Sequence, residues 1–263
     1  MAPQAAGVLT LPLSTIVSET LLAVFIVFCR IGGCLMIVPG YGSTRVPMQI
    51  RLMIAISVSL ALAPGLVDAI LVVIRQRDDA IPVALIGSEL LVGMTIGLMC
   101  RVFFLALDTM LSLMSNLIGY SSAMGVSLED NETEASLGAF IGLAAVTVLF
   151  LTGQQWELLR GLLLSYKSWP VTGSLSPQFL LFKVTDVLAM AFYVCLRLAS
   201  PFVVFGLISN FAMGLINKFT PQIPVFFIAT PFILAAGLLL LFFVTPEFLH
   251  LFITAYANWL RSP

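Results

Sequence analysis

The sequence predicts an all-α, polytopic membrane protein, and two features of the chain lead to this fold class. Of the 263 residues, 60% are hydrophobic and only 10% are charged, whereas about 25% of the residues of a soluble protein are charged. The hydrophobic residues also form long runs, near the roughly 20 residues that a membrane-spanning helix requires. Because lipid offers no hydrogen-bond partner to an open backbone, we interpret these runs as helices.

About six long helices are expected, each bounded by Pro, Gly or charged residues. In chain order they cover roughly residues 20–38, 47–66, 81–107, 135–159, 184–210 and 225–245. The Pro-Gly-Tyr-Gly sequence at 39–42 follows the first of them, and Pro221 and Pro224 precede the last. Residues 116–136 form the longest polar and irregular stretch, and residues 166–178 read as an ordinary connecting loop.

Charge and motif content exclude several classes of function. The net charge is −1 and the 12 basic residues are scattered, so the clustered Lys and Arg of a nucleic-acid surface are missing. The single histidine, His250, follows the last expected helix, and the helical H-E-x-x-H zinc motif does not occur. The G-x-S-x-G nucleophile turn and the G-x-x-x-x-G-K-[ST] phosphate loop do not occur either. We therefore expect no enzyme, no metal and no cofactor.

Five charged residues fall within the expected helices: Arg30, Glu89, Arg101, Asp186 and Arg197. A charge at the centre of a bilayer costs at least a few kcal/mol, so each of these must face protein or water. One interpretation is a polar conduit or an ion-coupled transport path. The other is ion pairing between packed helices or snorkelling near a helix end, and we favour it because no chain of Asp, Glu and His marks a proton relay.

A segment between two apolar runs has an unusual composition for membrane depth. Non-helical backbone survives there only where protein buries it or where it lines an aqueous cavity. Methionines around the segment offer an adaptable apolar seal, and a plain surface connector is the alternative. The segment comprises Gly119, Tyr120, Ser121, Ser122, Ala123, Met124 and Gly125, and the methionines that accompany Met124 are Met110 and Met114.

Two short segments near opposite ends of the chain combine Gly, Pro and apolar residues. The first is Arg30-Ile31-Gly32-Gly33, continuing through Val38-Pro39-Gly40-Tyr41-Gly42 to Val46-Pro47 and Arg51. The second is the Gly-Leu run at 214–215 that leads into the turn of Pro221, Gln222, Pro224, Val225 and Phe226. Together these two segments resemble the signatures of the FliR/SctT family of type III secretion export-gate proteins. The chain differs from the family pattern at two places. Family members often carry Gly-His where this chain has Gly153-Gln154-Gln155, and Pro224 stands where the family usually has Asn.

The resemblance implies a fold and a set of subunit contacts. Residues 1–178 would be FliP-like and would include the plug loop at 116–136, whereas residues 179–263 would form a FliQ-like helical hairpin. The segment from Gly119 to Gly125 would be the plug, and the turn at Pro221 would contact other subunits. The chain would take its place in a helical ring, where hydrophobic helices can bury their apolar faces against partners instead of lipid.

The same resemblance implies a function. The chain would be a subunit of the flagellar export gate in the bacterial inner membrane, at the flagellar basal body, forming and sealing the channel for unfolded flagellar proteins. FliP-like and FliQ-like membrane subunits would be its direct partners, with FlhB-like and FlhA-like export proteins nearby. An injectisome export gate is the alternative, and a small-molecule permease is a weaker one because the Pro and Gly interruptions do not form two matching repeats.

Overall fold

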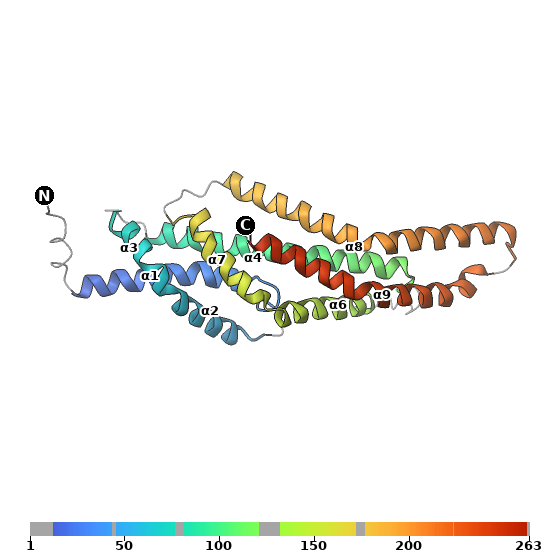
Figure 1. Ribbon diagram of the computed structural model, residues 1–263, viewed down its shortest axis with the longest axis horizontal. Coiled ribbons are helices and arrows are strands. Elements are labelled where there is room, and N and C mark those ends of the chain that lie inside the picture. The colour runs from blue at the N-terminus through green and yellow to red at the C-terminus, as the bar shows by residue number, and fades with distance from the viewer. Residues whose placement is uncertain are drawn as a thin grey trace. The chain divides into compact units, whose positions relative to one another are not determined.

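The computed structural model describes residues 13–43, 46–76, 82–120, 132–171, 177–222 and 224–261 (Figure 1). Within these ranges the all-α fold class is confirmed, since the chain forms eight α-helices and one 3-10 turn and no strand. The elements are α1 (Leu13–Leu35), α2 (Met48–Leu62), η1 (Ala63–Gly65), α3 (Val67–Gln76), α4 (Pro82–Leu117), α6 (Glu132–Leu151), α7 (Gln154–Ser168), α8 (Pro177–Phe219) and α9 (Val225–Arg261).

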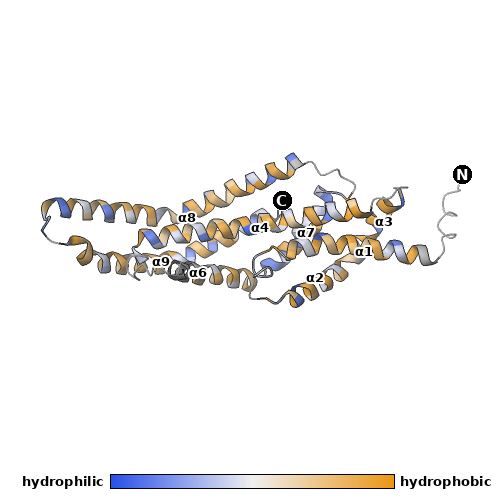
Figure 2. Ribbon diagram, turned by 180° about the vertical axis from the view of Figure 1, so that it is seen from behind, coloured by the Kyte–Doolittle hydropathy of each residue, from blue (hydrophilic) through white to orange (hydrophobic). Residues whose placement is uncertain are grey.

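Five of the helices in the described ranges are long and apolar enough to cross a membrane. They cover Ile16–Leu35, Met48–Gly65, Val83–Leu117, Leu180–Phe219 and Val225–Arg261. Hydrophobic residues run along their full length, with scattered hydrophilic turns (Figure 2). The prediction of a polytopic membrane protein is therefore confirmed in kind.

The expected helix boundaries were wrong in three places. The helix expected at 135–159 is interrupted at Gly153, whose φ of +74° ends α6 before α7 begins at Gln154. The short helix α3 was not expected, because a search for long apolar runs passes over ten residues. The helices α4, α8 and α9 extend beyond their expected ends, because residues taken as boundaries, such as Asp108 and Lys183, lie inside them.

The chain divides into two compact units. Unit 1 contains Met1–Arg101 and Leu162–Phe182, and unit 2 contains Val102–Gly161 and Lys183–Pro263. The expected division near residue 178 concerns likeness to FliP-like and FliQ-like subunits, which compactness does not test, so it stays a prediction.

In unit 1 the helix α1 contacts α2 and α3. An ion pair of 2.8 Å between Arg75 Nε and Glu19 Oε2 joins α3 to α1 at the surface. Ile26 and Ile31 of α1 are fully buried, whereas α2 leaves Met53 and Leu60 exposed. The helix α1 is therefore the centre of this unit, and α2 presents an apolar outer face.

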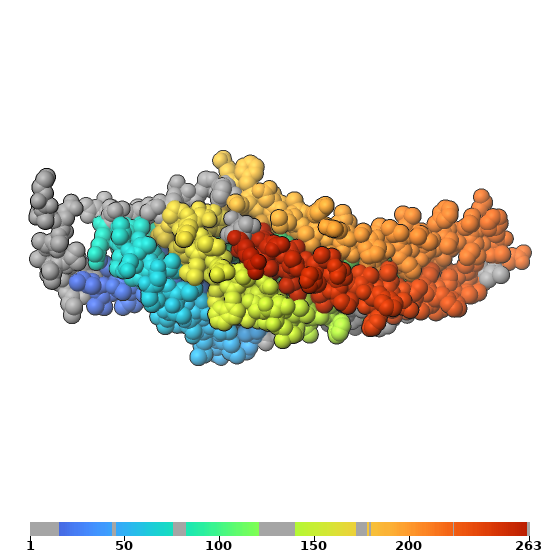
Figure 3. Space-filling view, viewed as in Figure 1, coloured from blue at the N-terminus to red at the C-terminus, as the bar shows by residue number. Residues whose placement is uncertain are grey.

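In unit 2 aromatic side chains fasten the second part of α4 to the end of α9. Phe103 stacks edge-on against Tyr256 with ring centroids 5.5 Å apart, and Phe104 stacks similarly on Phe252 at 5.4 Å. Such pairs add about 0.5–1.5 kcal/mol each beyond the area they bury. Elsewhere α8 and α9, orange to red in Figure 3, expose large apolar side chains such as Phe211.

Candidate functional site

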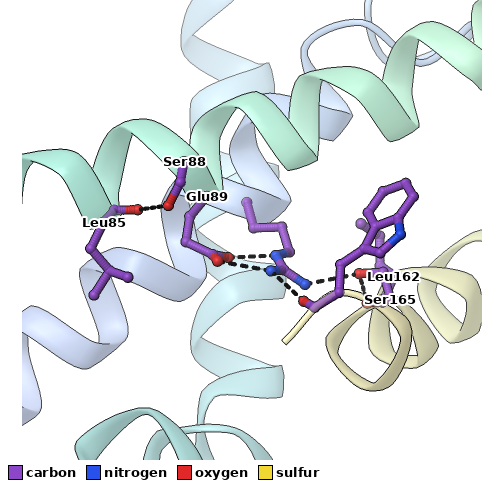
Figure 4. A network of polar contacts seen from close by, with 7 residues as sticks. Leu85, Ser88, Glu89, Leu162 and Ser165 are labelled. Carbon is purple, nitrogen blue, oxygen red and sulfur yellow. Dashed lines mark hydrogen bonds and ion pairs between the residues drawn. The ribbon is translucent and has the colours of Figure 1, made fainter. Parts of the chain in front are cut away.

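A fully buried arginine is the most unusual feature of unit 1. Arg30 of α1 has no exposed surface, and Glu89 of α4 is only 2% exposed. The guanidinium and the carboxylate form a bidentate pair, with Nε 2.5 Å from Oε2 and Nη2 2.8 Å from Oε1 (Figure 4). This fork geometry is the strongest form of arginine–carboxylate contact. The pair joins two helices through residues 59 positions apart in the chain.

The remaining donors of Arg30 reach the end of α7. Nη1 donates to Ser165 Oγ at 3.3 Å, and Nη2 donates to the carbonyl oxygen of Trp169 at 3.0 Å. Ser165 in turn donates to the carbonyl of Leu162 at 2.6 Å, as Figure 4 shows. A cation at a helix C-terminus interacts favourably with the unpaired carbonyls and the helix dipole. Arg30 therefore acts as a cap for α7 as well as the partner of Glu89.

The aromatic ring of Tyr166 packs against the guanidinium of Arg30. The ring centroid lies 3.9 Å from Arg30 Cζ, a cation–π contact. Burial raises the pKa of the Tyr166 hydroxyl, although the charge of Arg30 acts in the opposite direction. The hydroxyl oxygen is buried and has no hydrogen-bond partner among the residues that the structure describes. Tyr166 therefore stays neutral and contributes through its ring.

Glycines allow α4 to approach α1 closely enough for this pair to form. A Cβ at Gly93 would clash with the carbonyl oxygen of Arg30, and one at Gly97 would lie 2.7 Å from that of Cys34. On α1, a Cβ at Gly33 would lie 3.0 Å from the carbonyl oxygen of Leu90. Gly93 and Gly97 form a G-x-x-x-G pattern, which lets apolar helices pack backbone to backbone. This pattern is visible in the sequence, but the close approach of α1 and α4 was not among the expectations drawn from it.

The structure brings together only two of the five charged residues expected within helices. Ion pairing between packed helices, the interpretation that we favoured, holds for Arg30 and Glu89. Arg101, Asp186 and Arg197 are exposed and take part in none of the ion pairs found in the described ranges. Nothing in the sequence indicates which arginine meets Glu89, and the contacts to Ser165, Tyr166 and Trp169 could not be foreseen.

The expected plug segment is described only at its start. Gly119 has a φ of +74° and ends α4, with its amide donating to the carbonyl of Asn116 at 3.1 Å. Tyr120 follows, and residues 121–125 lie outside the described ranges. Met110 and Met114 are 9% and 1% exposed, so both pack inside unit 2. Their expected sealing role stays a prediction.

Close packing fixes the end of α4 just before this segment. A Cβ at Gly206 of α8 would lie 2.7 Å from Leu117 Cδ2, and one at Gly237 of α9 would lie 2.5 Å from Ile118 Cβ. Ile118 itself is fully buried. The residues before Gly119 are therefore held between two glycine surfaces of unit 2.

The second signature segment connects α8 to α9. The helix α8 ends at Phe219, Pro221 and Gln222 form a turn, and α9 begins at Val225. Pro221, Gln222, Pro224 and Phe226 are all exposed. This exposure leaves the turn free to meet another subunit, and that contact stays a prediction.

Three acceptor oxygens at the start of α7 also lack partners among the described residues. They are Oε1 of Gln154 and Gln155 and Oε2 of Glu157, all buried. The other carboxylate oxygen of Glu157 accepts from Arg261 at 3.1 Å. Gln154 and Glu157 are three positions apart and lie on the same side of the helix, whereas Gln155 points to a different side, so the three oxygens do not all converge on one site.

Comparison with known proteins identifies the family of this chain. The sequence model of the family described as "Bacterial export proteins, family 1" matches residues 21–259. A relative from Caulobacter vibrioides named flagellar biosynthetic protein FliR is 29% identical over 224 residues, covering 82% of this chain and 85% of its own length. The protein of that name from Aquifex aeolicus is 30% identical over 236 residues, with 87% of each chain covered.

A relative with a different name covers less of the chain. Yop proteins translocation protein T from Yersinia pestis is 28% identical over 160 residues, which are 60% of this chain and 61% of that protein. The family resemblance seen in the two signatures is thereby confirmed over most of the sequence. The chain belongs to the bacterial export proteins, family 1.

Proposed function

We propose that the chain is a subunit of the flagellar type III export gate, where it helps to form and seal the channel for unfolded flagellar proteins. The observation that carries this proposal is the match to proteins named FliR over 82–87% of the chain. The injectisome alternative rests on the Yop translocation protein, which matches over 60%. The longer coverage favours the flagellum.

The lengths of the helices support a place within a ring of partner subunits. The apolar part of α8 comprises 40 residues, which at about 1.5 Å per residue extends roughly 60 Å. The hydrocarbon core of a bilayer is about 30 Å thick, and helices tilt by at most about 40°. About 26 residues can then lie in lipid, so the remaining apolar surface needs protein to cover it. FliP-like and FliQ-like subunits are the proposed cover, with FlhB-like and FlhA-like proteins as further partners.

Three of the five charged residues within the helices support the need for partner subunits. Arg30 and Glu89 are satisfied within the chain, so they do not call for a partner. Arg101, Asp186 and Arg197 remain exposed on apolar helices. Co-expression with FliP-like and FliQ-like subunits, followed by detergent extraction, should therefore yield one large complex. A well-behaved solitary monomer with no affinity for those subunits would contradict the proposal.

The segment from Gly119 to Gly125 is proposed as the closing element of the channel. Its described start supports this, because Leu117 and Ile118 anchor it and Gly119 turns the chain out of α4. Removing Ser121 to Met124 should leave assembly intact but let small ions leak across membranes that hold the full complex. A tight membrane with normal amounts of the complex would place the seal in another subunit.

Secretion measurements test the function itself. Deleting the gene should abolish export of hook and filament proteins into the medium, and a plasmid copy should restore it. Motility and secreted flagellar proteins are measured in parallel with the secretion of injectisome effectors. Lost effectors with normal motility would favour the injectisome, and normal export of both would refute an export-gate role. In the proposed gate the chain conducts and does not catalyse, and the inner membrane at the basal body is its proposed site.

A further inference from the structure

One exposed face of α8 combines two opposite charges with apolar residues. Asp186, Met190, Tyr193 and Arg197, hereafter the α8 stripe, are spaced by four, three and four residues and so lie along one side of the helix. Met190 is 48% and Tyr193 is 68% exposed, and both charged residues are exposed as well. The opposite side is buried in unit 2 through Val187, Ala191, Cys195 and Leu198. The stripe is therefore the outward face of a packed helix.

Neither water nor lipid suits the α8 stripe. In water, the large apolar surfaces of Tyr193 and of its exposed neighbours Leu188 and Leu196 would stay in contact with solvent, which is unfavourable. In lipid, Arg197 follows Asp186 by eleven positions, which is about 16 Å along the helix axis and roughly half of the 30 Å hydrocarbon thickness. If Asp186 reaches one headgroup layer, Arg197 lies near the bilayer centre, where a charge costs at least a few kcal/mol.

We propose that the α8 stripe docks an apolar helix of another export-gate subunit. That helix places a basic residue opposite Asp186 and an acidic residue opposite Arg197, three turns apart, with apolar side chains against Met190 and Tyr193. Charge complementarity identifies this occupant, because only an apolar surface with two placed counter-charges satisfies both kinds of residue. The inference rests on the proposed export-gate function and adds the chemistry of the partner to it.

Two opposite charges also fix how the partner binds. A slip of one turn would move each counter-charge by about 5.4 Å and weaken both pairs at once. A reversed partner helix would set like charges against Asp186 and Arg197, which is destabilising at close range. The α8 stripe therefore selects one register and one direction from the many that a purely apolar face would accept.

A photocrosslinking experiment identifies the occupant in the assembled complex. Tyr193 is replaced by p-benzoylphenylalanine, and the buried Val187 is replaced in the same way as a control. The expected product at 193 is a crosslink to one membrane subunit, within a helix carrying opposite charges three turns apart. Crosslinks only to lipid, or only to another part of this chain, would overturn the proposal.

Charge reversal tests the energetics. Arg197→Glu should lower the amount of assembled complex by about tenfold or more, because it sets like charges together in an apolar interface. Replacing the facing acidic residue of the crosslinked subunit by Lys should restore assembly. Lys167→Glu is the control, since Lys167 is exposed on α7, outside the candidate spans, and takes part in none of the ion pairs of the described ranges. Normal assembly of the Arg197→Glu variant would refute the α8 stripe as a docking face.

The two proposals fail in different ways. If the chain is not an export-gate subunit, the wild-type protein will purify without flagellar membrane subunits. If only the α8 stripe is wrong, the wild-type and Arg197→Glu chains will assemble equally well with those subunits.

Discussion

Glu89→Gln removes the charge that balances a fully buried arginine. The side chain of Arg30 is 0% exposed and that of Glu89 is 3% exposed, so water cannot replace the lost carboxylate. Breaking a buried pair by removing one partner costs about 3–5 kcal/mol, because it leaves an uncompensated buried charge. For a domain of this size, each kcal/mol lowers the unfolding midpoint by about 2–4 °C. The variant should therefore unfold roughly 6–20 °C below wild type.

The assay compares folded protein after heating in detergent, measured as the remaining size-exclusion peak of the purified complex. Glu157→Gln is the matched control, since its ion-pair partners Arg160 and Arg261 have side chains that are 71% and 59% exposed, and such surface pairs contribute about 0–1 kcal/mol. The double variant Arg30→Met/Glu89→Leu should lose less stability than the sum of the two single changes. Equal effects of the Glu89 and Glu157 variants, or strict additivity, would refute the buried-pair reasoning.

Three further changes test other parts of the structure. Gly93→Ala should separate α1 from α4 and reduce the amount of folded protein, whereas Gly87→Ala, where a Cβ meets nothing within 4 Å, should not; immunoblots of membranes measure both. Tyr166→Phe keeps the ring over Arg30 and should be nearly neutral at pH 7. The raised pKa of Tyr166 makes wild type lose stability above about pH 10, by at most about 1.4 kcal/mol per pH unit, and a similar alkaline loss in the Phe variant would disprove this cause. Replacing Pro221 and Gln222 together by Ala should lower complex yield and export, and unchanged secretion would make the turn a mere spacer.

Composition and apolar runs were sufficient for the fold class. Charged residues are so few, and hydrophobic runs so long, that only helices burying their backbone polar groups satisfy the chain. The signatures around Arg30 and Pro221 were sufficient for the family. The sequence did not determine where each helix ends. A charged residue such as Asp108 can end a helix or lie inside one, and its own chemistry does not decide which.

The tertiary structure decided which of the charged residues form an ion pair. Arg30 and Glu89 were both recognised as costly charges within apolar helices, yet nothing in the sequence joined them or excluded Arg101. Their meeting depends on Gly93 and on the end of α7, which packing brings to the same place. Hydrophobicity and charge belong to each residue and can be read along the chain, whereas the partner of a buried charge is set by which backbones approach closely enough to exclude water.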